Sequence, residues 1–249
     1  MEERFTDACK NGDLKKAQLL LQENPTIDIS ARNEYAFRWA CAYGHLKVAQ
    51  WLLQVKPTIN ISAVNDDIFA LNECAFIWAC YYGHLEVAQW LLQVKPTIDI
   101  SAENEYVFRV ACVKGHLNVA QWLLQVKPNI DISVYNEHAF CHACANGHLE
   151  VAQWLLQMKP TINISADYEH AFYRACYNGR LKVAQWLLQI RPDKYLIDID
   201  NLNNIEPMIR TEQDQLWYKI QYLMELSENK KHRLYKLSMD TIWFMSLYI

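Results

Sequence analysis

Apolar residues recur along most of the chain in two short stripes, and the pair of stripes repeats at a regular interval. In the unit from Asn33 to Ala63, the first stripe consists of Phe37, Ala40 and Cys41. The second stripe follows after a short gap and consists of Leu46, Ala49, Leu52 and Leu53. Residues three and four apart share one face of an α-helix. Each unit is therefore predicted to be a pair of helices, each with one buried face.

Glycine and proline occur at fixed positions in the units. All six glycines occupy one position between the two stripes: Gly12, Gly44, Gly83, Gly115, Gly147 and Gly179. The step between successive glycines is constant, except that the step from Gly44 to Gly83 is longer by seven positions. Six of the seven prolines follow a glycine at one fixed distance, as Pro57 follows Gly44. The glycine is expected to end the first helix in a left-handed conformation, and the proline ends the second.

A repeat of this length predicts a solenoid, in which each unit packs on its neighbours. The alternation of polar and apolar residues over 58–62 predicts a short extended loop into the next unit. We therefore predict an all-α solenoid of stacked helix-turn-helix units with short extended loops. Six units are expected at about 1–32, 33–71, 72–103, 104–135, 136–167 and 168–199, followed by a divergent helical C-terminal cap over 200–249. The first unit is expected to cap the N-terminal end, because it carries Asp13, Lys15, Lys16 and Leu19 in the stretch where inner units have a histidine, an apolar valine and a tryptophan.

The start of each second helix carries the motif Gly-His-Leu-x-Val-Ala-x-x-Leu-Leu. It occurs at Gly44–Leu53, Gly83–Leu92, Gly115–Leu124 and Gly147–Leu156, and at Gly179–Leu188 with Arg180 in place of histidine. This motif resembles the ankyrin repeat, over roughly residues 1–199. The family's Thr-Pro-Leu-His opening is absent, and the unit is one residue shorter than the family's usual repeat. The segment GHLEVAQWLLQVKPTI is also similar in sequence to the ankyrin families of giant amoebal viruses.

Composition and charge narrow the possible partners. The net charge is −4, and lysine and arginine are dispersed, so a basic surface for nucleic acid is not expected. No apolar run approaches the roughly 20 residues needed to span a bilayer, and the charged N-terminal sequence has no apolar segment typical of a signal peptide. We expect an intracellular protein, in the host cytoplasm if it is viral, with no nucleic-acid or membrane partner.

The eight cysteines are interpreted as reduced core residues. Six of them lie three residues before a repeat glycine: Cys9, Cys41, Cys80, Cys112, Cys144 and Cys176. Equivalent sites in stacked repeats are expected roughly 10 Å apart, the spacing of packed helices, which exceeds the reach of a disulfide. Buried thiols as small apolar fillers fit this pattern, and they indicate a reducing compartment.

The glycine spacing also argues against enzymatic chemistry. Phosphate-binding loops need several glycines close together, and here the nearest two glycines are a whole repeat apart. The same spacing excludes a G-x-S-x-G nucleophile elbow. We therefore predict no catalytic residues, no cofactor and no small-molecule substrate. The histidines after four of the glycines recur in identical surroundings, so they are interpreted as structural residues that bond the adjacent turn: His45, His84, His116 and His148.

One cluster breaks the repeat and has the residue types of a metal site. His138, Cys141 and Cys144 are three residues apart, with His142 and His148 nearby. Zinc normally takes four such ligands. Cys144 is the core cysteine of its repeat, and a lone C-x2-C is weak evidence for a site. The favoured interpretation is that the protein holds no metal.

The second helices carry a regular series of tryptophans: Trp51, Trp90, Trp122, Trp154 and Trp186. Each has an alanine two positions earlier, and a large residue beside a small one conserves the core volume. A regular aromatic series is usually part of a core. These residues are interpreted as a packed structural ladder.

Positions that vary between the units are candidates for partner binding, because the constant positions are needed for packing. They fall at the loop tip, on the first helix and just before the glycine, which the ankyrin resemblance places on the partner-facing surface. Tyrosine, tryptophan and arginine, common among them, dominate binding hot spots. The predicted partner-binding residues are Arg32, Tyr35, Arg38, Tyr43, Phe69, Leu71, Tyr81, Tyr82, Glu103, Tyr106, Arg109, Lys114, Tyr135, His138, His142, Asp167, His170, Arg174 and Tyr177.

Two features of this set have open alternatives. Trp39, Ile77 and Trp78 either face a partner or pack between helices. The longer step between Gly44 and Gly83 places apolar Ile68, Phe69 and Leu71 in one loop, which either contacts a partner or packs on the scaffold.

Taken together, the sequence predicts a non-enzymatic, monomeric scaffold that binds a protein partner on the concave face of a solenoid. The alternative is an adaptor that recruits a ubiquitin ligase or another host complex through residues 200–249. The sequence does not identify the partner.

Overall fold

The computed structural model describes residues 1–63 and 73–190, except for the side chains of 167–170, 173 and 188. These residues form twelve helices and no β-strand. The helices are α1 (Glu2–Lys10), α2 (Leu14–Glu23), α3 (Ala31–Ala42), α4 (Leu46–Val55), α5 (Cys74–Tyr81), α6 (Leu85–Val94), α7 (Ala102–Val113), α8 (Leu117–Val126), α9 (Val134–Asn146), α10 (Leu149–Met158), α11 (Ala166–Tyr177) and α12 (Leu181–Ile190). The predicted all-α fold is confirmed.

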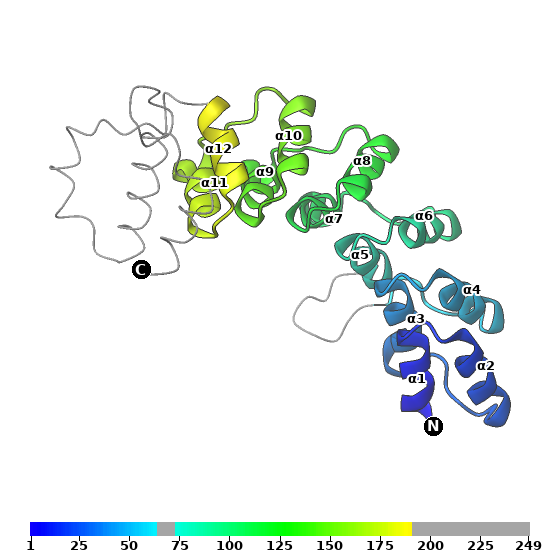
Figure 1. Cartoon of the computed structure of the whole chain (residues 1–249). Helices are drawn as coiled ribbons and strands as arrows, with labels where there is room; N and C mark the ends of the chain where they lie inside the picture. Colours follow the sequence, from blue (N-terminus) through cyan, green and yellow to red (C-terminus); the bar gives the residue numbers. More distant parts are fainter. Residues whose placement is uncertain (64–72, 191–249) are drawn as a thin grey trace, which may run out of the picture.

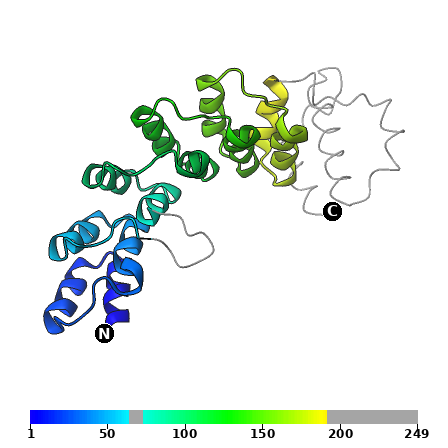
Figure 2. The same ribbon diagram turned by 180° about the vertical axis from the view of Figure 1, so that it is seen from behind.

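The helices stack in pairs along an arc (Figure 1). The odd-numbered helices form the inner, concave row and the even-numbered helices form the outer row; the view from behind shows the same two rows (Figure 2). Each inner helix contacts the next, as α3 contacts α5 and α7 contacts α9. The concave surface is therefore built from the first helix of each unit.

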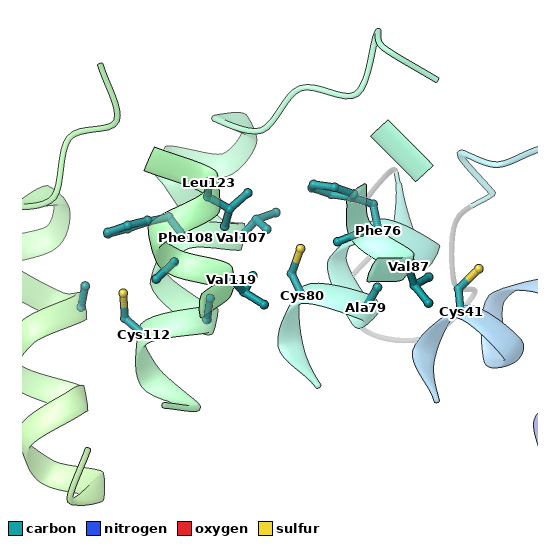
Figure 3. Close-up of a cluster of buried hydrophobic side chains, with 14 of the residues drawn as sticks. Cys41, Phe76, Ala79, Cys80, Val87, Val107, Phe108, Cys112, Val119 and Leu123 are labelled. Carbon is teal, nitrogen blue, oxygen red and sulfur yellow. The ribbon is translucent and has the colours of Figure 1, made fainter. Parts of the chain in front are cut away.

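The core is continuous from one unit to the next (Figure 3). Inner helices contribute small Ala and Cys residues beside one phenylalanine, such as Phe108, which is 0% exposed. The outer helices contribute Val, Ala and Leu, such as Val119 and Leu123. Small residues where helices cross and one large ring per unit allow close packing of the stack.

The predicted tryptophan ladder is an alternation of phenylalanine and tryptophan across neighbouring units. Phe76 lies against Trp122 with ring centroids 6.3 Å apart, and Phe108 lies against Trp154 at 6.2 Å. The same tilted pair recurs at Phe5–Trp51, Phe37–Trp90 and Phe140–Trp186. Each tryptophan thus fixes its own unit to the preceding one, which supports its structural interpretation.

The repeated histidines also join neighbouring units. The Nε2 of His116 donates to the carbonyl of Tyr81 in the preceding unit at 2.9 Å. Its ring lies over Gly83, where an added Cβ would come within 2.4 Å of Nδ1. The histidine bond is therefore structural, as predicted, but it reaches back to another repeat rather than into its own turn. In the first unit, Asp13 takes this position and caps α2 by accepting from the N–H of Lys16 at 3.0 Å.

These histidines predict a dependence of stability on pH. The pKa of His84, His116 and His148 is lowered from the ordinary 6.5, first by burial; for His84 the nearby His116 and His45 lower it further. Near pH 6 the unfolded chain therefore binds more protons than the folded chain, so acidification favours unfolding. The stabilisation is present above about pH 6.5 and decreases as the pH falls below it. We expect the melting temperature to fall by a few degrees between pH 7.5 and pH 5.

A variant in which His84, His116 and His148 are changed to Gln is the control for this prediction, because glutamine donates a similar hydrogen bond but does not titrate. Its melting temperature should change less over the same pH range. An equal change in both proteins would assign the pH dependence to other groups.

A left-handed turn precedes several inner helices. Arg32, Asn33 and Glu34 have φ of 54°, 53° and 59°, and the same run recurs at 103–105 and 135–137. Such a conformation costs roughly 1–2 kcal/mol for each non-glycine residue. Buried charged side chains hold it: Arg38 donates from Nε to the carbonyl of Asn33 at 2.7 Å and from Nη2 to that of Arg32 at 3.1 Å. An arginine of the following helix therefore stabilises the turn in two units, whereas at 135–137 the same conformation occurs with Cys141 at the equivalent position.

In two of these turns a glutamate connects successive loops. Glu137 is 8% exposed; its Oε2 accepts from the Ser133 hydroxyl at 2.6 Å, and its Oε1 accepts from the backbone N–H of Asn163 at 3.2 Å. Glu34 accepts in the same way from the N–H of Asn60 at 3.1 Å. This link between loops was not predicted from the sequence.

All eight cysteines are buried and none forms a disulfide. Burial raises the pKa of Cys9 and of Cys176 to about 12, and raises the pKa of Cys41, Cys80 and Cys112 still more. These thiols are therefore protonated near neutral pH and act as core residues. The interpretation of the repeat cysteines as reduced fillers agrees with this arrangement.

Candidate protein-binding surface

One face of each inner helix carries the residues that lie nine, five and one positions before the repeat glycine. In α3 and its C-terminal cap these are Tyr35, Trp39 and Tyr43. They are spaced by four residues and therefore share one helix face. Phe37 and Ala40 of the same helix are fully buried, and Phe37 packs against Trp90 of the outer row. By helical spacing, Tyr35, Trp39 and Tyr43 lie on the opposite side of α3, away from the outer row.

Two neighbouring units place six aromatic side chains on or beside this face. We call them the aromatic stripe: Tyr35, Trp39 and Tyr43 from the second unit, and Trp78, Tyr81 and Tyr82 from the third. Trp39 stacks on Tyr43 with centroids 5.3 Å apart, Tyr43 on Tyr82 at 6.0 Å, and Tyr82 on Trp78 at 5.7 Å. The interplanar angles of these three pairs are 16–20°. The ring faces are thus turned toward one another across the boundary between units.

Lysines stand at both ends of the aromatic stripe. The Lys10 ammonium lies 4.9 Å from the Trp39 ring centroid and 5.7 Å from that of Tyr43. The Lys114 ammonium lies 4.5 Å from the Tyr81 ring centroid. All three distances are within the range of a cation–π interaction. The surface therefore combines apolar area with a positive charge on each side.

Tyr82 and Tyr106 are hydrogen-bond donors at neutral pH. The pKa of Tyr82 is raised by burial and by its neighbours Tyr43 and Tyr81, against the opposing effect of Lys114. The pKa of Tyr106, in the next unit, is raised by burial and by Tyr81, against the effect of Arg109. Protonated phenols can donate to carbonyl and carboxylate oxygens of a partner.

The structure brings together five of the predicted partner-binding residues in or beside the aromatic stripe: Tyr35, Tyr43, Tyr81, Tyr82 and Lys114. Tyr43 is 40% exposed and Tyr82 is 39% exposed, so both are accessible. Other predicted residues lie elsewhere on the surface or on α7, α9 and α11: Arg32, Glu103, Tyr106, Tyr135, His138, His142, Arg174 and Tyr177. Among these, Tyr135 at a loop tip and Tyr177 at the end of α11 are well exposed.

Arg38 and Arg109 require a correction. They were predicted to face a partner, but they are only 6% and 9% exposed. Arg109 donates to the carbonyl of Asn104 at 2.9 Å and to that of Glu103 at 3.1 Å, as Arg38 does in its own turn. Their guanidinium groups are directed into the left-handed turn because its carbonyls need donors. They therefore position the loop tip.

Some predictions concern residues outside the described part. Phe69, Leu71 and the rest of the insertion lie outside the described residues, as does the C-terminal segment 200–249. The side chains of Asp167 and His170 also lie outside the described part of the structure. The role of the insertion and the adaptor hypothesis stay predictions.

Trp39, Trp78 and Lys10 belong to the site but were not among its predicted residues. The structure separates the open alternatives: Ile77 packs against the core, whereas Trp39 and Trp78 stack on the surface tyrosines. The spacing of four residues from Tyr35 to Trp39 to Tyr43 is the signal that could have identified the tryptophans. For Lys10, the signal is its place two residues before the glycine, which corresponds to Tyr81.

The His138 cluster does not assemble a metal site in the described residues. The rings of His138 and His142 stack with centroids 4.2 Å apart, while Cys141 and Cys144 are buried in the core. In this part of the chain no group of three or more His, Cys, Asp and Glu side chains is placed to hold a metal ion. Likewise, none of its helices is long and apolar enough to cross a membrane.

The arc of paired helices with a constant core and a variable inner surface defines a helical repeat scaffold. A family model described as "Ankyrin repeats (3 copies)" matches residues 5–104, 62–136 and 108–198. The chain belongs to the ankyrin repeat family, whose repeats generally mediate protein–protein interaction and are typically non-enzymatic.

Comparison with solved structures supports the fold. The human ASB11 ankyrin repeat domain superimposes with a TM-score of 0.54 and is 18% identical in sequence; the match covers 74% of this chain and 82% of that one. The comparison with curated proteins finds no significant match. The structural similarity establishes the fold.

Proposed function

We propose that this protein is a non-enzymatic scaffold that binds a protein partner on its concave surface, with the aromatic stripe as the centre of the contact. The observation that carries the proposal is the continuous stack of Trp39, Tyr43, Tyr82 and Trp78 across two units. These surface rings are separate from the aromatic rings of the core, which are the phenylalanine–tryptophan pairs on the other side of the inner helices.

The composition of this surface supports the proposal. Large rigid aromatic side chains supply contact area at a small cost in conformational entropy, which is why Tyr and Trp dominate hot spots. The stack holds these rings in place before a partner arrives, and this preorganisation lowers the cost of binding. The buried cysteines fit a reducing compartment, as the sequence predicts. Similarity to giant-virus families stays a prediction.

The test compares two pairs of equally exposed residues. Tyr43→Ala/Tyr82→Ala removes two rings of the aromatic stripe, which are 40% and 39% exposed. Val55→Ala/Val94→Ala removes apolar side chains that are 45% and 41% exposed on the outer row. We expect the first variant to bind the partner about tenfold more weakly or worse, as for loss of hot-spot residues, and the second to bind normally.

The partner is first isolated by affinity capture with the wild-type chain, and its affinity for each variant is then measured by calorimetry. Circular dichroism must show that both variants are folded. A folded Tyr43→Ala/Tyr82→Ala variant that binds with wild-type affinity would contradict the proposal. Arg38 is unsuitable for this test, because its loss would disturb the turn rather than remove a contact.

A further inference from the structure

The chemistry of the concave surface indicates what kind of segment it takes. Resting on the proposed function, we propose that the aromatic stripe binds an extended segment of the partner that carries an acidic residue near each end and proline or aliphatic residues between them. The segment crosses the inner helices along the row formed by Lys10, Tyr43, Tyr82, Tyr81 and Lys114.

This row lies at the C-terminal ends of the inner helices. Its members are one or two positions before the glycines of the first four units, so the row runs across α1, α3, α5 and α7. Its only charged members are the lysines at its two ends. Asp7 lies about one helical turn away from the row, and Glu3, further along α1, pairs with Arg32 at 4.0 Å. The row is therefore positive at both ends although the whole chain has a net charge of −4.

The stacking of the rings determines which groups of a partner they can meet. Because the faces of Tyr43 and Tyr82 are turned toward each other, the surface presents ring edges and hydroxyls rather than open faces. Ring edges carry partial positive charge, and phenols donate hydrogen bonds. Both features favour carbonyl and carboxylate oxygens, and the apolar area between them favours proline and aliphatic side chains.

The same stacking argues against single-stranded nucleic acid. Bases bind to aromatic platforms by stacking on open ring faces, along a groove that is positive throughout. Here the faces of Tyr43 and Tyr82 that are turned toward each other are already covered. The Lys10 and Lys114 ammonium groups lie over the rings of Tyr43 and Tyr81 at the ends of the row. A polymer with a charge at every residue has no matching cations in the middle of the row.

The length of the segment follows from the distances along the row. The Lys10 ammonium lies 5.7 Å from the Tyr43 ring centroid, the rings of Tyr43 and Tyr82 are 6.0 Å apart, those of Tyr82 and Tyr81 are 4.9 Å apart, and the Lys114 ammonium lies 4.5 Å from the Tyr81 centroid. The two ammonium groups are therefore no more than about 21 Å apart, and an extended polyproline-type chain rises about 3.1 Å per residue. The two acidic residues should therefore be about five to seven residues apart.

A display library of random twelve-residue peptides, selected on the immobilised full chain, tests this inference. We expect the enriched peptides to carry Asp or Glu at two positions about five to seven residues apart, with proline or aliphatic residues between. An enriched peptide should bind about tenfold more weakly to Tyr43→Ala/Tyr82→Ala. It should bind about threefold more weakly to each of Lys10→Gln and Lys114→Gln, as expected for exposed ion pairs.

Charge reversal supplies the sharper experiment. The folded variant Lys10→Glu/Lys114→Glu should select basic residues at the same two positions. Unchanged selection would overturn the inference, as would enriched peptides that lack the acidic pair or the absence of any peptide that depends on the aromatic stripe. Binding of a twelve-residue oligothymidylate that is lost in the lysine variants would overturn it in favour of nucleic acid.

The two proposals fail in different ways. A captured partner that binds Tyr43→Ala/Tyr82→Ala with wild-type affinity contradicts the proposed function itself. A captured partner that depends on the aromatic stripe but contacts it without an acidic segment leaves the proposed function standing and overturns only this inference.

Discussion

Replacement of Gly83 by alanine is expected to lower the free energy of unfolding by about 3 kcal/mol. Gly83 has φ of +81°, where a side chain costs roughly 1–2 kcal/mol. The new Cβ would also lie 2.4 Å from Nδ1 of His116, so the imidazole has to move. Moving it breaks the 2.9 Å bond to the carbonyl of Tyr81, which adds about 1 kcal/mol. Urea denaturation followed by circular dichroism measures the change.

Gly179→Ala is the matched control, because Gly179 also has positive φ, +66°, but an added Cβ meets nothing within 4 Å. Its cost should be limited to the backbone contribution of about 1–2 kcal/mol. In the double variant Gly83→Ala/His116→Ala the clash is absent, so the loss should be smaller than the sum of the two single losses. Equal losses for Gly83→Ala and Gly179→Ala would show that the histidine contact contributes nothing.

Replacement of Arg109 by methionine is expected to lower the free energy of unfolding by about 2 kcal/mol. The guanidinium makes two hydrogen bonds to carbonyls of the left-handed turn, and the net contribution of hydrogen bonding to a charged group is about 1.5–3 kcal/mol. It also lies 4.7 Å from the centroid of the exposed Tyr135 ring. Methionine fills similar volume but supplies no donor, so the two carbonyls lose their partners. The turn itself should persist, because the same conformation occurs at 135–137 with Cys141 at the equivalent position.

Two further variants separate geometry from charge. Arg109→Lys keeps the charge but lacks the planar fork that reaches both carbonyls, so it should recover only part of the loss. Arg32→Gln changes an arginine whose side chain is 72% exposed, and its effect should be under about 0.5 kcal/mol. The same denaturation experiment measures all three. If Arg109→Met were as mild as Arg32→Gln, the guanidinium would not stabilise the turn.

The periodicity of the sequence predicted most of the fold. Phe37, Ala40 and Cys41 are buried where the helical spacing placed them, and Gly83 adopts the left-handed conformation expected of a helix end. The extended loops show the expected alternation, with Ile59 buried and Asn60 exposed. These properties depend on residues a few positions apart, so the local pattern contains the information that determines them.

The candidate site was predicted only in part. The comparison of units identified Tyr43, Tyr81, Tyr82 and Lys114 as variable, which is a property of single positions. It could not tell a variable residue that faces solvent from one that is buried for another purpose, and so it included Arg38. The left-handed run at 32–34 was also missed, because Arg32 and Glu34 have no intrinsic preference for positive φ.

The sequence by itself determined the repeat, the helix pairs, the core positions and the family, because each unit repeats one local pattern. Only the tertiary structure decided which side chains meet across units. The contacts of His116 with Gly83, of Trp122 with Phe76 and of Tyr43 with Tyr82 join residues more than thirty positions apart. Their geometry follows from the stacking of whole helices, and no pattern within one unit contains it.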